Sequence, residues 1–348
     1  MYCLLTLAAN AALLIVARRS AVFAEWYASR LFPLFPNTLG RLFSPLPFSV
    51  LEMLIALTAA GLPLFLLWSV VQAVRGQTTG GRKAVWPPLA AACCTLLLIY
   101  TLTCGINYSR APLSAALGLE PRPYSARELR SLFTLLNEKA ALAAEDIQTD
   151  ARGYFILSED PGEEGRMAMG RLGGEYGPLK AYYPLPKAVI CSRALSYLHI
   201  AGVYSPFTVE ANYNRDMPPT ELPFSICHEL AHLCGYARED EANFIAYLAC
   251  EGSGNPGLYY SGQLTALTYA LNALYGEIPS GEYKELIDGL PAQVSRDMHR
   301  NAIYWQAFAG PAAELSRNVN DHYLKANDQP DGVKSYGRML DLLLAYYF

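Results

Sequence analysis

Apolar residues are concentrated in the first third of the chain, in three long stretches without a charged residue. These stretches run over residues 1–17, 53–74 and 84–109. A helix that crosses a bilayer needs about 20 apolar residues, so we expect three transmembrane helices in a membrane domain over residues 1–109. For the first stretch a cleaved signal peptide is the alternative, although it lacks a basic start and an obvious cleavage site.

The basic residues between these stretches predict the orientation of the chain. Arginines lie in the longer first loop, and a denser basic group lies in the shorter second loop. Cytoplasmic loops are enriched in Lys and Arg, which favours a cytoplasmic second loop. We therefore predict a multi-pass protein of the cell membrane with an extracytoplasmic carboxy-terminal domain. The residues concerned are Arg18, Arg19, Arg30 and Arg41 in the first loop, and Arg75, Arg82 and Lys83 in the second.

Residues 110–348 have the polarity and length of a soluble domain. A capping box at Ser125 and Glu128 starts an amphipathic helix that we expect to reach about Ala151. The Gly- and Glu-rich stretch 160–177 predicts a surface excursion, and the alternation in 204–214 predicts one strand. Most of the remaining sequence is typical of helices, so the expected fold is mainly α with a small sheet.

The motif His228-Glu229-Leu230-Ala231-His232 is the main chemical feature of this domain. Residues i and i+4 share one face of a helix, so both imidazoles can reach one tetrahedral Zn²⁺. Glu229, offset by about 100° on the helix, would face the water that the zinc activates. Residues 220–223 suit a helix start. Gly235 suits a helix end, where the capping residue often has a left-handed backbone conformation.

A third metal ligand is expected from the acidic first turn of the next helix, where Glu239 and Glu241 are the candidates. Asn243 follows Glu239 by one turn, an offset that suits a side chain that orients a zinc-bound histidine. Glu241 has the apolar Ile245 at that offset, but its distance from Gly235 suits a ligand as well. We rank Glu239 ahead, and both remain candidates.

The net charge bears on the binding partners of the protein, and the cysteine spacing bears on disulfides. The formal net charge is −4 and there is no basic block, so nucleic acid is not an expected partner. Cys227 and Cys234 lie seven residues apart on one predicted helix, about 10 Å, which is too far for a disulfide. We expect them to be buried thiols.

The chain also resembles a largely uncharacterised family of bacterial multi-pass membrane proteins with a zincin-type metalloprotease domain. The resemblance implies a zincin-like fold over 110–348, with no substrate to carry over. The Glu-Asp-Glu-Ala-Asn stretch at 239–243 is also similar, by local motif, to the third-ligand region of bacterial membrane sensors of antibiotic stress and of repressor-cleaving proteases. The resemblance includes residues 104–108, 205–212, 228–248, 323–327 and 332–337.

These features predict a membrane-anchored zinc metallopeptidase that hydrolyses peptide bonds, with Glu229 as general base and His228, His232 and one of the two glutamates on Zn²⁺. In zincins an edge strand pairs with the substrate backbone, and 204–214 is placed for that role or for a structural one. The expected partners are a peptide or protein substrate and the lipid bilayer. The alternative is a non-catalytic membrane receptor or sensor. The tetrahedral intermediate of such a reaction carries an oxyanion that a hydrogen-bond donor usually stabilises, and the candidate donors are His322, Tyr323 and Tyr336.

Overall fold

The protein is described here by a computed structural model that covers residues 1–75 and 78–348, and the side chains of residue 73 and residues 78–86 lie outside the description. The amino-terminal third is helical. Its elements are α1 (Tyr2–Arg19), α2 (Ala21–Arg30), the π-helical turn η1 (Pro36–Gly40), α3 (Arg41–Phe43), α4 (Val50–Val74), α5 (Thr78–Thr103) and the 3-10 turn η2 (Gly105–Ser109).

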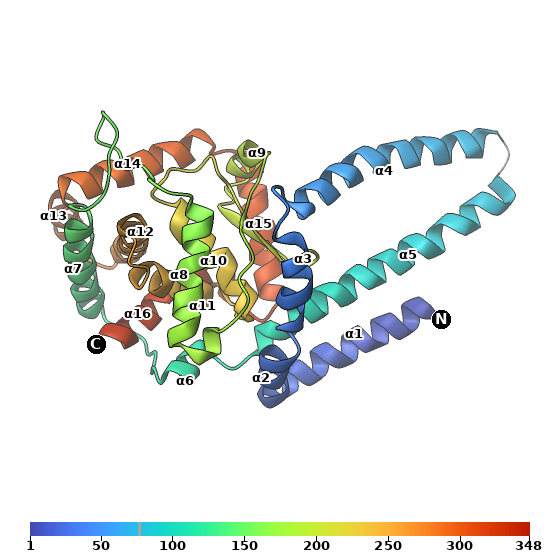
Figure 1. Ribbon diagram of the computed structural model, residues 1–348, viewed down its shortest axis with the longest axis horizontal. Helices are drawn as coiled ribbons and strands as arrows, with labels where there is room; N and C mark the ends of the chain where they lie inside the picture. The colour runs from blue at the N-terminus through green and yellow to red at the C-terminus, as the bar shows by residue number, and fades with distance from the viewer. Residues whose placement is uncertain (76–77) are drawn as a thin grey trace.

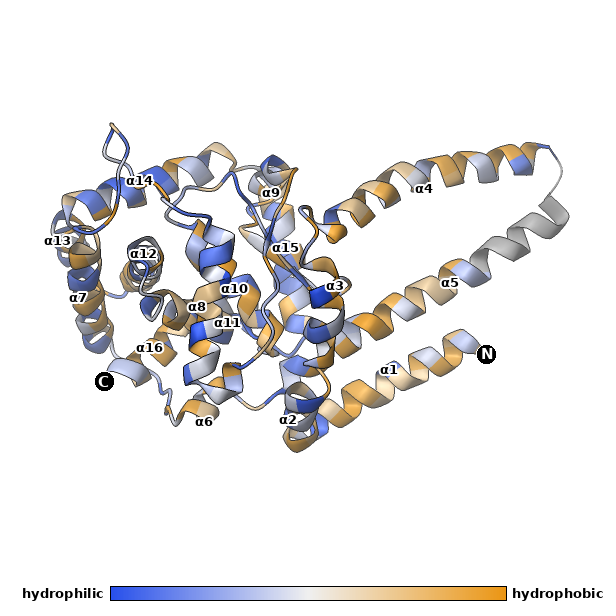
Figure 2. Cartoon of the chain, in the orientation of Figure 1, coloured by the Kyte–Doolittle hydropathy of each residue, from blue (hydrophilic) through white to orange (hydrophobic). Residues whose placement is uncertain are grey.

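Three of these helices, α1, α4 and α5, project from the same side of a globular part (Figure 1). Helix α4 runs away from that part and α5 returns to it, while α1 lies beside α5. Tyr2 at the start of α1 bonds Thr95 of α5 through its hydroxyl at 2.6 Å. Their surfaces are largely apolar along their described length (Figure 2).

The prediction of three membrane spans is wrong by one. Two described helices are long and apolar enough to cross a bilayer: α1, and residues Val50–Gln72 of α4. In α5 the apolar segment is shorter, Pro87–Thr103. The uncharged stretch 84–109 looked longer because its last residues leave the helix and pack in the protein as η2, with Ile106 and Asn107 buried.

Hydrogen bonds join the start of α4 to the globular part. The Glu210 carboxylate accepts hydrogen bonds from the backbone N–H groups of Val50 and Leu51, at 3.1 Å each, and so caps α4. Glu52 in turn accepts from the N–H groups of Ile190 and Cys191. The domain boundary at residue 109 stays a prediction, and the structure adds that residues on its two sides are bonded to each other.

The globular part is mainly helical, and its helices surround one small sheet (Figure 1). Its helices are α6 (Leu113–Leu117), α7 (Ala126–Ala143), α8 (Pro161–Glu175), α9 (Ser192–Tyr197), α10 (Leu222–Ala231), α11 (Glu239–Glu251), α12 (Pro256–Leu274), α13 (Ser280–Asp288), α14 (Ala292–Ala307), α15 (Pro311–Ala326) and α16 (Met339–Tyr347), with the 3-10 turns η3 (Gly177–Leu179), η4 (His232–Cys234) and η5 (Gly332–Arg338). Its strands are β1 (Lys187–Ala188), β2 (Gly202–Ser205) and β3 (Glu210–Tyr213).

The predicted strand at 204–214 is a hairpin of two strands. In the described sheet β3 lies in the middle, parallel to β1 and antiparallel to β2, with Tyr204 opposite Ala211. The chain turns between them because the Ser205 hydroxyl accepts a bond from the Thr208 N–H and Val209 has a φ of 56°. Strand β2 is therefore an edge strand.

Two other predictions also need correction. Residues 160–177 are not a surface excursion: Asp160 caps helix α8, Pro161 opens it, and Gly165 allows it to pack closely on Ile226 of α10. The capping box at Ser125 is confirmed, but α7 ends at Ala143, eight residues before the expected end. Helices α7, α8, α10, α11, α12 and α16 enclose the main core.

Candidate metal centre

Helix α10 carries the histidine motif and begins and ends where the sequence predicts. Pro223 occupies its first turn, where the missing N–H needs no partner. The helix tightens into η4 at His232 and stops at Gly235, whose φ of 85° is left-handed. Space is also short there, because a Cβ at Gly235 would lie 3.2 Å from the Arg110 guanidinium and 3.3 Å from the Phe32 ring.

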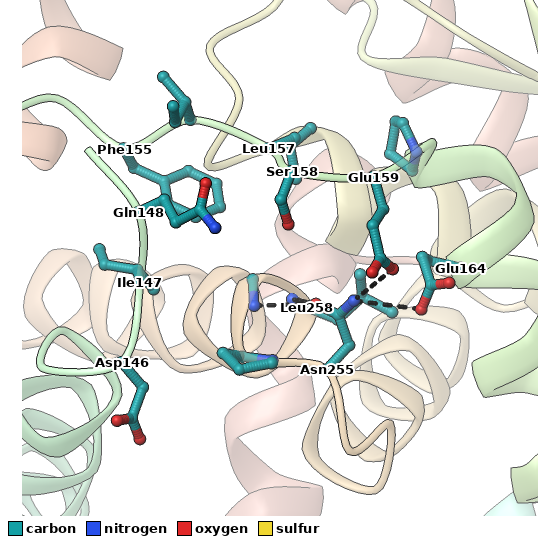
Figure 3. A pocket seen from close by; sticks show the side chains of 14 residues that line it. Asp146, Ile147, Gln148, Phe155, Leu157, Ser158, Glu159, Glu164, Asn255 and Leu258 are labelled. Carbon is teal, nitrogen blue, oxygen red and sulfur yellow. Dashed lines mark hydrogen bonds between the residues drawn. The ribbon is translucent and has the colours of Figure 1, made fainter. Parts of the chain in front are cut away.

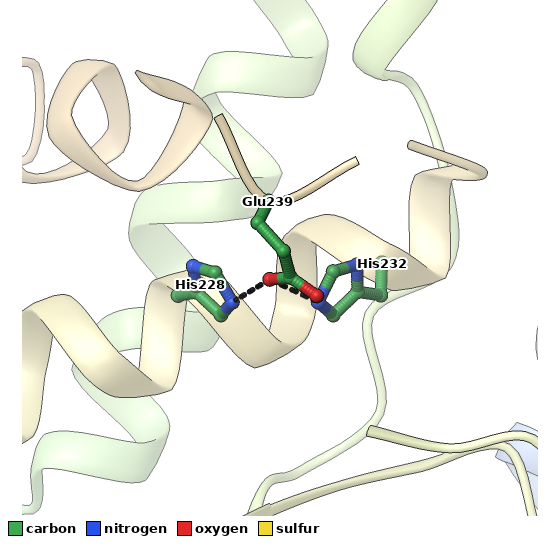
Figure 4. A group of neighbouring side chains, drawn as sticks. All are labelled: His228, His232 and Glu239. Carbon is green, nitrogen blue, oxygen red and sulfur yellow. Dashed lines mark ion pairs between the residues drawn. The ribbon is translucent and has the colours of Figure 1, made fainter. Parts of the chain in front are cut away.

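The structure brings His228, His232 and Glu239 together (Figure 4). One ligand atom from each residue lies within 4.8 Å of the other two. Glu239 Oε2 is 3.1 Å from His228 Nε2 and 3.9 Å from His232 Nε2. Two imidazole nitrogens and a carboxylate oxygen thus converge on one point from α10, η4 and the first turn of α11.

The outer nitrogen of each imidazole is bonded to a fixed oxygen. His228 Nδ1 lies 2.7 Å from Asn243 Oδ1, and His232 Nδ1 lies 2.8 Å from the carbonyl oxygen of Tyr236. Asn243 is itself held, because its amide nitrogen donates to the carbonyl oxygen of Tyr336 at 3.0 Å. Oxygen acceptors at Nδ1 place a proton there, so the neutral form of each imidazole carries its lone pair on Nε2, the atom that faces Glu239.

The two candidate glutamates have different surroundings, although two residues apart. The Glu241 carboxylate accepts from the Leu113 N–H at 2.6 Å and pairs with the Arg238 guanidinium. Glu239 Oε2 is buried and accepts no hydrogen bond from any residue in the described part of the chain. Glu241 therefore joins α11 to α6, whereas Glu239 is the carboxylate that faces the histidines.

Charge and burial compete within the cluster. Burial acts to raise the pKa of Glu239, but the two histidines outweigh it and the net pKa is lowered. Burial acts to lower the pKa of His228, but Glu239 and Glu229 outweigh it, and the net pKa is raised. The pKa of His232 is lowered by burial. Glu239 is therefore held ionised, and His232 is held neutral.

Glu229 lies beside the cluster on the side of the sheet edge. Burial raises its pKa to about 7, against the opposing effect of His228. A Cβ at Gly202 in β2 would lie 2.6 Å from Glu229 Oε1, so only glycine leaves room for this carboxylate. Tyr204, also in β2, places its ring 5.7 Å from that of His232. The edge strand is thus in direct contact with the motif helix.

The three candidate oxyanion donors are separated by the fold. Tyr336 is close to the cluster, with its ring stacked 6.0 Å from that of His228. Tyr323 lies instead against Tyr100 and Tyr108, and His322 is exposed. Of the three, only Tyr336 contacts a residue of the motif.

Some residues around the cluster were not predicted from the sequence. Arg110 is buried, and its guanidinium donates two hydrogen bonds to the Glu25 carboxylate, at 2.9 and 3.0 Å. It also donates to the Cys234 carbonyl at 2.8 Å and stacks over the Tyr236 ring. Arg110 therefore fixes the turn whose carbonyl at Tyr236 orients His232. No spacing rule reveals such a contact, because 85 residues separate Arg110 from Glu25.

A separate pocket lies between the 146–164 segment and the start of α12 (Figure 3). Its lining includes Glu159 and Glu164, which both accept from the amide of Asn255. The same amide group's oxygen caps α12 by accepting from Gly257 and Leu258. None of His228, His232 and Glu239 lines this pocket.

Comparison with known proteins gives one match. Residues 27–344 match the family described as "Protein of unknown function (DUF3810)". No curated protein and no solved structure matches the chain. The match runs from within α2 to within α16, and so includes both the candidate metal cluster and the projecting helices α4 and α5.

Proposed function

The chain belongs to the DUF3810 family, whose function is unknown, and we propose from the site that it is a membrane-anchored zinc metallopeptidase. The observation that carries this proposal is the convergence of His228 Nε2, His232 Nε2 and the Glu239 carboxylate within 4.8 Å of one another. Two imidazoles and a carboxylate form the protein ligand set of many hydrolytic zinc sites.

Two features of the residues fit a bound zinc ion. Glu239 Oε2 is buried and accepts no hydrogen bond among the described residues, which a cation between it and the imidazoles would remedy. The Nδ1 partners of both histidines fix the tautomer in which Nε2 can act as a ligand. Bound there, Zn²⁺ would polarise a carbonyl group and make water a nucleophile at neutral pH.

Glu229 supplies the general base in this proposal. Its carboxylate is buried beside the cluster, on the side where the edge strand β2 passes. It would take a proton as water attacks the peptide carbonyl and give that proton to the leaving amine. The ring of Tyr336 stacks on that of His228. In this proposal, the Tyr336 hydroxyl donates a hydrogen bond to the oxyanion that develops on the peptide carbonyl.

The edge strand β2 supports a peptide as the substrate. Its outer edge has no strand partner in the described sheet, and its first residue Gly202 lies against Glu229. An extended peptide that paired with β2 would pass over Glu229 and the histidines. The zincin-like fold is part of this proposal, as is an extracytoplasmic position of the site.

Membrane anchorage is proposed from α1 and α4, whose length and apolar composition suit a bilayer. Helix α5 returns from the end of α4 to the globular part and lies beside α1, and its apolar segment Pro87–Thr103 is shorter than those of α1 and α4. In that arrangement the amino terminus lies on the side opposite the globular part.

The test uses the full-length protein in detergent, because Arg110 and Glu210 join the two parts of the chain. We expect about one zinc per chain by mass spectrometry. Glu239→Gln and His228→Ala should lose the metal, and the matched Glu241→Gln should keep it. Glu229→Gln should keep the metal and lose hydrolysis of a peptide library by a factor of about 10² to 10⁴.

Other results would contradict the proposal. A folded wild-type protein that binds no zinc would exclude the metal site. Bound zinc with equal library hydrolysis in wild type and Glu229→Gln would exclude the peptidase mechanism and leave a metal-binding receptor.

A further inference from the structure

Helix α15 (Pro311–Ala326) exposes large apolar side chains on its outer side and has polar side chains on the side that faces the protein. The side that faces the protein carries Ala313, Ser316, Asn320 and Leu324, two of which are polar. The opposite side carries Leu315 and Val319, one turn apart and 66% and 61% exposed. A helix that needed only the protein core would place these two side chains inward.

The amino-terminal end of α15 is connected to the base of α4. Phe308, three residues before the helix, packs edge-to-face on Tyr197 of α9 at 5.0 Å. Helix α9 directly follows Ile190 and Cys191, whose N–H groups are bound by Glu52 in the first turn of α4. The chain segment that starts α15 thus adjoins the place where α4 leaves the globular part.

The carboxy-terminal end of α15 is connected to the bases of α1 and α5. Arg18 at the end of α1 donates to the Ala326 carbonyl at 3.0 Å and pairs with Asp328 at 2.8 Å. The Tyr100 hydroxyl of α5 donates to Asn327 at 2.8 Å. Tyr323, in the last turn of α15, packs against Tyr100 as well.

These connections fix how α15 lies relative to the projecting helices. A helix of 16 residues is about 24 Å long, and its two ends adjoin the bases of α4 and of α1 and α5. It therefore crosses the face from which these helices leave, as Figure 1 shows. Leu315 and Val319 are exposed on the side of α15 opposite the side that packs on the globular part.

We propose that α15 is an interfacial helix that lies on the surface of the lipid bilayer between α4 and α5, with Leu315 and Val319 among the acyl chains. A lipid surface fits better than a second protein because the exposed stripe is continuous with Tyr323 at the base of α5. Helices of this kind bury their apolar face by about 5–10 Å in the headgroup and acyl boundary.

The charges of α15 indicate that apolar contact, and not anionic headgroups, holds it there. Glu314 and Asp321 balance Arg317 and Lys325, so the helix has no net charge. His322 lies beside the stripe, and its Nδ1 is bonded to the Asn318 carbonyl at 2.7 Å. Its ring can lie at the polar boundary, as amphipathic side chains do.

This inference rests on the proposed membrane anchorage and not on the proposed hydrolysis. Its test incorporates the photo-crosslinking amino acid p-benzoylphenylalanine at position 315 or 319 of the full-length protein in phosphatidylcholine nanodiscs. Asn318, exposed on the polar side of the same helix, is the matched control position. Leu64 of α4, 67% exposed, reports whether the protein is inserted.

After illumination we expect roughly fivefold more phosphatidylcholine adduct at 315 and 319 than at 318, with strong labelling at 64. Equal labelling at 315, 319 and 318, or adducts to protein in place of lipid, would overturn the interfacial helix while α4 remains inserted. An absence of lipid adducts at 64 would remove the membrane premise and the proposal with it. Zinc binding and peptide hydrolysis are unaffected by any of these outcomes.

Discussion

Helices α4 and α11 show opposite arrangements of polar and apolar side chains. No residue of the α4 segment Val50–Gln72 is buried, although that segment is the most apolar of the chain. In α11, the polar side chains of Glu239, Glu241 and Asn243 are all buried. Apolar side chains thus face outward in α4, and polar side chains face inward in α11. The difference fits the two surroundings that we propose, a lipid phase outside α4 and a metal site beside α11.

The same leucine truncation in α4 and in the main core tests this difference most directly. Leu267 of α12 is fully buried in the main core, and Leu64 of α4 is 67% exposed. Leu267→Ala should lower the free energy of unfolding by about 3 kcal/mol, because it removes buried contacts and leaves a cavity. Leu64→Ala should leave it unchanged within about 0.5 kcal/mol. Chemical unfolding in detergent, followed by tryptophan fluorescence, measures both.

Equal losses in the two variants would mean that Leu64 is packed against protein. That result would contradict the exposed surface of α4.

A second large effect is expected where the two regions meet, at Arg110. Arg110→Lys keeps the charge but loses the paired bonds to Glu25 and the bond to the Cys234 carbonyl. We expect a loss of about 2 kcal/mol in unfolding free energy. The zinc affinity should fall as well, because the neighbouring Tyr236 carbonyl orients His232.

The matched control is Arg152→Lys, since Arg152 is exposed and lies 3.5 Å from Asp150 in a surface pair. It should change neither quantity. If Arg110→Lys resembled this control, the joint between the amino-terminal helices and the site would have no energetic importance.

The parts of the fold that could be predicted from the sequence depend on local rules. The start of α10 at Pro223 and its stop at Gly235 follow from residues inside or next to the helix. The capping box at Ser125 is equally local. The one-turn offset of Asn243 from Glu239 predicted a contact with one of the two histidines, and Asn243 Oδ1 lies 2.7 Å from His228 Nδ1. Each case needs only helix geometry and the chemistry of its ends.

The predictions that were wrong or left open needed information from distant residues. Residues 160–177 contain many glycines, which a sequence reading takes for a loop, but Gly165 allows close contact with Ile226. The end of the apolar part of α5 depends on η2, whose Ile106 packs with Ala24 and Tyr27. The choice between Glu239 and Glu241 depends on the Leu113 N–H, which binds Glu241 from 128 residues away.

A smaller effect tests the electrostatics of the core, at Glu221 beside α10. Burial raises the pKa of Glu221 to about 7, against a hydrogen bond from the Trp305 indole of 2.7 Å. Because its pKa is higher in the folded than in the unfolded chain, stability from this group is fully present below the unfolded pKa of about 4.3 and is lost as the pH rises through 7.

Glu221→Gln keeps an acceptor for Trp305 and removes the buried charge. The variant should match wild type near pH 4 and exceed it by about 2 kcal/mol at pH 8. Thermal unfolding across this pH range measures the difference. A constant difference at all pH values would show that Glu221 does not titrate in that range.

The smallest effect is expected at Glu52, which bonds the first turn of α4 to the end of β1. Its carboxylate accepts from the N–H groups of Ile190 at 2.9 Å and Cys191 at 2.7 Å, and both bonds are exposed to solvent. Glu52→Ala should therefore lower stability by only about 0.5–1 kcal/mol, but hydrogen exchange of the Ile190 and Cys191 amides should become faster. Glu120→Ala, at an exposed position, is the control and should leave both amides unchanged. Unchanged exchange in the Glu52 variant would show that the Glu52 bonds do not hold α4 to the globular part, and the bonds of Glu210 would then be the connection at the first turn of α4.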